Sequence, residues 1–122
     1  MANLKVVEIK AFVPAKDFEL SKRFYGDLGF KLASDGGGVA YFVHDDASFL
    51  LQDFYNEELA KNLMMHLLVE DVDAWRASVS ESGVAEKYGV KVTEPTQQPW
   101  RMRDFVVIDP SGVMWRIAQN TE

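Results

Sequence analysis

The chain contains few side chains that could carry covalent or metal chemistry. It has no cysteine, which removes disulfides, thiolate metal ligands and a cysteine nucleophile together. One of its two histidines, His44, lies in a His-Asp-Asp turn, where we expect it to be solvated; the other, His66, lies in an apolar run. The ordinary pKa of imidazole is near neutrality, so His66 could bind a ligand or act as a base, although a lone strand histidine is more often structural. No Ser/His/Asp arrangement, phosphate loop or glycine-rich nucleotide fingerprint is found.

The charge balance narrows the class of partner. The 122 residues include 13 Lys and Arg against 19 Asp and Glu, a net charge of −6. Phosphate binding needs a basic face, so we expect no nucleic-acid partner, whereas a cationic ligand is compatible with the acidic balance. No segment approaches the roughly 20 apolar residues that span a bilayer, and residues 1–10 lack the apolar run of a signal peptide. We therefore expect a cytoplasmic protein with no membrane partner.

The patterning of the first half predicts a β-α-β-β-β order. Residues 6–13 are apolar and partly alternating, which is typical of a strand. Asp17 is the expected N-cap of a helix that ends at Gly29. Short apolar runs separated by turn residues then predict three strands, at residues 30–33, 39–43 and 47–54.

The same order recurs in the second half. Residues 62–69 predict a strand, and Asp71 is the expected N-cap of a helix that ends near Gly83. Further strands are predicted at residues 90–93, 105–108 and 113–118, with a proline-containing loop at 94–99 and a polar, partly helical linker at 55–61. Phe24, Tyr25 and Trp75 lie on helical stripes that predict core positions. We therefore predict an α+β fold of two tandem β-α-β-β-β modules, about residues 1–56 and 62–120, in a single domain over 1–122.

Three segments resemble signatures of the vicinal oxygen chelate superfamily, which comprises glyoxalases, bleomycin resistance proteins and dioxygenases. Residues 21–30 (SKRFYGDLGF) are similar to its first-helix motif S-x-x-F-Y-x-x-x-L-G-F, with a slightly different spacing before the leucine. Residues 104–112 resemble its D-P-x-G hairpin, and residues 97–100 (QQPW) resemble the Q-P-W of antibiotic-sequestering members. The resemblance implies curved mixed sheets around a cleft, and a homodimer with two sites at its interface. Arg101 departs from the motif, in which a glycine commonly follows the tryptophan.

The resemblance also supplies a test for metal. Metal-dependent members place His or Glu at four inward-facing strand positions, and first-row divalent ions need such donors. Counting from the motifs puts Glu8, Gln52, Met64 and Arg116 at these positions. Glu8 is a good ligand, but the fixed charge of Arg116 opposes a cation. We therefore expect no metal, no cofactor and no catalytic residue.

The same strand positions predict a ligand-binding cleft, because alternate residues of a strand share a face. Trp100 is the strongest candidate, since in resembling proteins this residue stacks on a planar part of the drug; packing over the sheet is the alternative. Glu8 and Arg116 could face each other across the cleft, and we favour a bridge between them over contact with a charged ligand. The predicted ligand-binding residues are Trp100, Tyr41, His66, Gln52, Met64, Glu8, Arg116 and Met114.

Three functions follow as hypotheses. The leading one is bleomycin-resistance-like sequestration, in which a homodimer binds a small planar antibiotic or metabolite, cationic or not, without metal. The second is a glyoxalase- or dioxygenase-like enzyme of the same fold, which would use a divalent metal or Glu8 and His66 as acid and base. The third is an accessory module that binds an unrelated metabolite.

Overall fold

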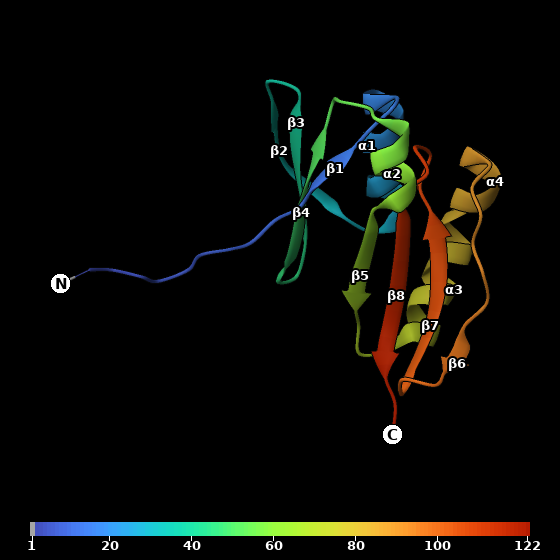
Figure 1. Cartoon of the computed structure of the whole chain (residues 1–122). Helices are drawn as coiled ribbons and strands as arrows, with labels where there is room; N and C mark the ends of the chain where they lie inside the picture. Colours follow the sequence, from blue (N-terminus) through green and yellow to red (C-terminus); the bar gives the residue numbers. More distant parts are fainter. Residues whose placement is uncertain (1) are drawn as a thin grey trace.

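The first half of the chain forms one four-stranded sheet (Figure 1). The structure is a computed structural model that describes residues 2–122. The sheet has the strand order β1-β4-β3-β2, in which β1 is parallel to β4 and the other pairs are antiparallel. Its elements in chain order are β1 (Phe12–Pro14), α1 (Phe18–Leu28), β2 (Lys31–Gly36), β3 (Val39–His44) and β4 (Ala47–Gln52).

The second half repeats this topology in the order β5-β8-β7-β6, with β5 parallel to β8. The predicted α+β architecture of two β-α-β-β-β units is therefore confirmed. A helix, α2 (Glu57–Asn62), occupies most of the linker that was expected to be partly helical. The remaining elements are β5 (Met64–Leu68), α3 (Val72–Ser82), α4 (Val84–Tyr88), β6 (Thr96–Gln98), β7 (Met102–Ile108) and β8 (Met114–Asn120).

The two long helices begin and end where local chemistry predicts. The Asp17 carboxylate accepts a hydrogen bond from the Leu20 N–H at 3.1 Å, and Asp71 caps α3 in the same way. Gly29 and Gly83 end these helices with φ of 129° and 72°, a region that favours glycine. No helix among residues 2–122 is long and apolar enough to cross a membrane.

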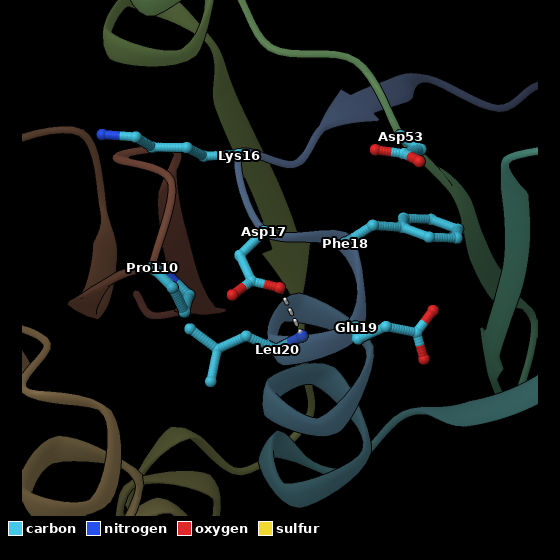
Figure 2. Close-up of a pocket in the computed structure, with 7 residues that line it drawn as sticks. All are labelled: Lys16, Asp17, Phe18, Glu19, Leu20, Asp53 and Pro110. Carbon is cyan, nitrogen blue, oxygen red and sulfur yellow. Dashed lines mark hydrogen bonds between the residues drawn. The ribbon is translucent and has the colours of Figure 1, made fainter.

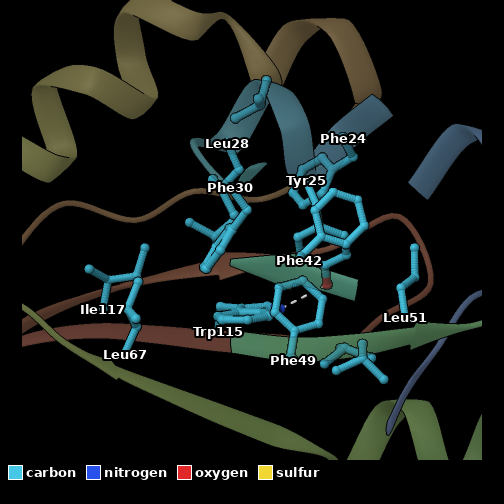
Figure 3. Packing of buried hydrophobic residues seen from close by; sticks show 14 of the residues in the cluster. Phe24, Tyr25, Leu28, Phe30, Phe42, Phe49, Leu51, Leu67, Trp115 and Ile117 are labelled. Atoms are coloured by element: carbon cyan, nitrogen blue, oxygen red, sulfur yellow. Dashed lines mark hydrogen bonds between the residues drawn. The ribbon is translucent and has the colours of Figure 1, made fainter. Parts of the chain in front are cut away.

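One core joins the two sheets, with Tyr25 of α1 near its centre (Figure 3). The Tyr25 ring lies 4.8 Å from Phe49 and 5.5 Å from Trp115 between centroids. Its hydroxyl donates to the buried Asp109 carboxylate and accepts from Trp115 Nε1 at 2.8 Å. Tyr25 and Phe24 are fully buried as predicted, whereas Trp75 is partly buried.

The predicted strand over residues 6–13 is wrong for its first six residues. β1 begins at Phe12, and residues 2–11 run away from the body without secondary structure (Figure 1). In the parallel register Phe12 pairs with Leu50, so Ile9 would fall opposite Ala47, the first residue of β4. Residues before Ile9 therefore extend past the end of this sheet.

The predicted strand at residues 90–93 is also wrong. Only a bridge between Val92 and Val107 forms there, while β6 lies within the predicted loop. Both segments follow the same strand, because Thr93 N–H donates to the Val106 carbonyl at 2.9 Å and β6 pairs with the start of β7. Pro95 lies between them and has no N–H, so it interrupts the ladder.

Candidate functional site

The sheet faces opposite the core carry most of the predicted site residues. On β3 and β4, Phe42 and Phe49 point into the core, so the alternating residues Tyr41, Leu50 and Gln52 point the other way and are half-buried. β5 and β8 follow the same rule. We call the two uncovered faces the open faces. The residues of the second open face that were predicted are Met64, His66, Met114 and Arg116.

Strand register brings these residues together in pairs. Tyr41 lies beside Leu50 on the first open face. On the second, Met64 lies beside Met114, and His66 beside Arg116. His66 is exposed. Each face thus joins apolar side chains to a few polar ones, which is the composition of small-molecule sites.

Glu8 is the centre of a polar cluster on the first open face. Its carboxylate accepts hydrogen bonds from Tyr41 Oη at 2.9 Å, from Lys10 Nζ at 2.7 Å and from Ser48 Oγ. Hydrogen bonds from Lys10 and then Ser48 lower the pKa of Glu8 to about 2. A carboxylate that is so easily ionised is a weak base, so this geometry does not favour Glu8 as a general base near neutral pH.

A second polar cluster lies on the other open face. Arg116 Nη1 donates to Asp104 Oδ2 at 3.0 Å, and Gln98 Nε2 donates to Asp104 Oδ1 at 3.0 Å. Asp104 is only 2% exposed, and its charge neutralises that of Arg116. A guanidinium has five N–H donors, so Arg116 keeps donors for an acceptor on a ligand.

The expected bridge between Glu8 and Arg116 is wrong for the single chain. Glu8 pairs with Lys10, and Arg116 pairs with Asp104 on the neighbouring strand. Asp104 was not identified as a site residue in the sequence analysis. Alternation nevertheless places this charged side chain on the same face as Val106, within an otherwise apolar strand. That signal was available in the sequence.

Trp100 lies in the turn between β6 and β7 and is 54% exposed. It therefore does not pack fully over the sheet within one chain. The following residue, Arg101, has a φ of 64°, a conformation that favours glycine. The backbone at this turn thus has the geometry expected where resembling proteins carry a glycine.

His44 differs from its expected solvated state. Its Nδ1 lies 2.8 Å from the Gly29 carbonyl oxygen, and its ring lies 5.0 Å from Trp75 between centroids. A groove of about 720 Å³ next to it is lined by residues 44–47, 67–71, Ala74 and Trp75. Another hollow, of about 580 Å³, lies at the start of α1, where Asp17, Phe18 and Asp53 line it (Figure 2).

Five hollows among residues 2–122, including the two above, are lined by residues other than the predicted site residues. The open faces are therefore exposed surfaces in one chain rather than a closed cleft. Within the same range, no three His, Asp or Glu side chains gather closely enough to hold a metal ion.

Comparison with known proteins connects this fold to a family. The family model of the Glyoxalase/Bleomycin resistance protein/Dioxygenase superfamily matches residues 6–117. No curated protein gives a significant match. Among solved structures, the antibiotic-binding protein TnmS3 from Streptomyces sp. CB03234 is 27% identical, with a TM-score of 0.75 over 98% of this chain and 100% of that chain.

Two bleomycin-binding proteins have the same fold. One, solved with bleomycin, is 21% identical with a TM-score of 0.81 over 94% of this chain and 99% of that chain. The other, from bleomycin-producing Streptomyces verticillus and solved with copper(II)-bleomycin, is 21% identical with a TM-score of 0.73 over 97% and 99%. Since the family model covers most of its length, the chain belongs to the Glyoxalase/Bleomycin resistance protein/Dioxygenase superfamily.

Proposed function

We propose that this protein sequesters a small planar antibiotic or related metabolite, as bleomycin-resistance proteins do, without forming or breaking bonds in it. The exposed indole of Trp100, in the turn between β6 and β7, carries the proposal, because tryptophan is enriched at binding surfaces. Likeness to an antibiotic-binding protein over nearly the whole chain supports it.

The ligand contacts would come from both open faces. Trp100 and Tyr41 offer aromatic surfaces for stacking, while Met64 and Met114 supply adaptable apolar contact. Arg116 and His66 offer hydrogen bonds. A cationic ligand would suit the net charge of −6 and the π-face of Trp100.

The site would lie at the interface of a homodimer, since one chain presents the open faces as exposed surfaces. Two chains related by a twofold axis would form two equivalent clefts. The protein would act as one cytoplasmic domain with no cofactor.

Substitution of Trp100 tests this assignment. Trp100→Ala should weaken the affinity for metal-free bleomycin by at least about tenfold, whereas Trp100→Phe should retain part of it, because a smaller ring still stacks. Leu59→Ala, at an exposed apolar residue of α2, is the matched control and should bind like the wild type. If Trp100→Ala bound bleomycin with the affinity of the wild type, Trp100 would not be part of the binding site.

Metal content separates sequestration from the enzyme hypothesis. We expect chelator-treated protein to bind the drug as well as untreated protein does, because the candidate contacts need no metal. The enzyme hypothesis would instead be established if a divalent ion copurified at one equivalent per chain, and if adding that ion back to chelator-treated protein restored a catalytic activity.

A further inference from the structure

The groove of about 720 Å³ beside His44 lies apart from the open faces, between the β3–β4 turn and the end of β5. A smaller hollow of about 250 Å³ adjoins it, because His44, Ala74 and Trp75 line both. Sites for small molecules usually have volumes of about 300–1,000 Å³. The groove therefore has the size of a site for one small organic molecule.

One wall of the groove is aromatic and held in place by the surrounding chain. The indole of Trp75 lies against Gly29, where an added Cβ would come within 3.8 Å of two of its ring carbons. The His44 ring lies 5.0 Å from Trp75 between centroids, at an interplanar angle of 61°. Leu67 and Val69 add apolar surface to the lining. A ligand with an apolar or aromatic body would thus meet a preformed surface, which lowers the entropic cost of binding.

The imidazole of His44 offers a hydrogen-bond acceptor in this wall. Its Nδ1 lies 2.8 Å from the Gly29 carbonyl oxygen, and a carbonyl only accepts, so Nδ1 carries the proton. In the neutral ring Nε2 is then an acceptor. The nearest carboxylate oxygen, Oδ2 of Asp45, lies 3.7 Å from Nε2, which is too far for a hydrogen bond and is itself an acceptor. A ligand that carries N–H donors would complete this bond.

The charge of the lining selects a cation. Four acids line the groove, namely Asp45, Asp46, Glu70 and Asp71, and no Lys or Arg of residues 2–122 does. Asp71 caps α3, whereas Asp46 and Glu70 make no side-chain hydrogen bond or ion pair within the same range. A cleft lined by one sign of charge concentrates the opposite sign, and the π-face of a tryptophan such as Trp75 also attracts cations. No three acids or histidines of residues 2–122 gather closely enough to hold a metal ion, so an organic cation fits better than a metal.

We infer that this groove is a second ligand site, which binds a small organic ammonium ion with an apolar or aromatic body. The body lies against Trp75, an ammonium N–H donates to His44 Nε2, and Asp46 and Glu70 balance the charge. The site shares no residue with the open faces or with Trp100, so the inference does not rest on the proposed function.

Titration with phenethylamine, followed by ¹H–¹⁵N NMR at low salt and neutral pH, tests the site. The three indole N–H signals report on different places: Trp75 on the groove, Trp115 on the core and Trp100 on the proposed antibiotic site. Loss of a signal in Trp75→Phe assigns the first. Phenethylamine should shift the Trp75 signal and amides of residues 44–47 and 67–71, and leave Trp100 unchanged. It should bind at least about fivefold more tightly than phenethyl alcohol, its uncharged counterpart.

Removal of the two unpaired charges is the second arm of the test. Asp46→Asn/Glu70→Gln, at exposed positions that should leave the fold intact, should weaken phenethylamine binding about threefold to tenfold and leave phenethyl alcohol binding unchanged. Glu58→Gln/Glu81→Gln is the matched control, because it changes the net charge equally at exposed positions outside the groove, and it should bind like the wild type.

Three results would each overturn the inference: an unshifted Trp75 signal, equal affinity for the amine and the alcohol, or equal loss of affinity in the two double variants. Tighter binding of a lysine-containing pentapeptide than of phenethylamine would assign the groove to a basic peptide and overturn it as well. Bleomycin binding is measured separately through Trp100, so failure of the proposed function and failure of this inference are distinguishable.

Discussion

Replacing Tyr25 with Phe should destabilise the protein far more than the loss of one hydroxyl at the surface. The hydroxyl donates to Asp109, which is 2% exposed, and accepts from Trp115 Nε1 at 2.8 Å. Tyr25→Phe removes both bonds. It leaves the buried indole N–H without an acceptor, and the buried Asp109 carboxylate keeps only the N–H groups of Ser111 and Val113, which both donate to Oδ1. An unsatisfied buried group costs about 1–3 kcal/mol and a hydrogen bond to a charged group contributes about 1.5–3 kcal/mol, so we expect a loss of about 2–4 kcal/mol.

Urea unfolding at neutral pH measures this difference, and the melting temperature should fall by roughly 10 °C. Tyr88→Phe is the matched control, because that hydroxyl donates to Asp27 at the surface and its loss should cost under about 1 kcal/mol. Equal effects of the two variants would refute the reasoning, since burial of the Tyr25 network would then make no difference.

Three further predictions concern single side chains. Arg101→Gly should stabilise the fold by about 0.5–1 kcal/mol in urea unfolding, because Arg101 has a φ of 64°; a loss of stability would show that its side chain makes a needed contact. Asp104→Asn should cost about 1–3 kcal/mol by the same measurement, because it leaves Arg116 without its counter-charge; a neutral result would mean that solvent screens the pair. Asp109→Asn and Asp27→Asn should show opposite pH dependence in unfolding experiments between about pH 3 and 7. Burial raises the pKa of Asp109, so the stability advantage of the wild type over Asp109→Asn should decline as the pH rises. Hydrogen bonds from Lys87 and Tyr88 lower the pKa of Asp27, so the stability advantage of the wild type over Asp27→Asn should grow as the pH rises. If both stability differences changed in the same direction with pH, these assignments would be contradicted.

Features that depend on neighbours in the chain were predictable from the sequence. Asp17 and Asp71 cap their helices because a side-chain oxygen reaches an N–H three residues later, which is local chemistry. Gly29 and Gly83 end the helices for an equally local reason. The repeated order of strands and helices follows from these signals and from hydrophobic periodicity.

Features that depend on distant strands were not predictable in this way. Residues 6–11 have the composition of a strand, but pairing requires a neighbour, and β4 begins at Ala47, opposite Ile9, so residues 6–8 have none on this sheet. Likewise, alternation placed Glu8 and Arg116 on open faces without saying which charge each would meet. Lys10 lies two residues from Glu8, and Asp104 lies on the strand beside Arg116, so each side chain had a nearer partner than the other.

The most direct test of sequestration is the melting temperature of chelator-treated protein with and without metal-free bleomycin. A ligand that binds only the folded state stabilises it by about 2.7 kcal/mol at 100 times its Kd, which should raise the melting temperature by roughly 10 °C. The account predicts this rise, its loss in Trp100→Ala, and recovery of the drug unaltered. No rise at saturating drug, or a rise that requires added metal or accompanies conversion of the drug, would contradict it.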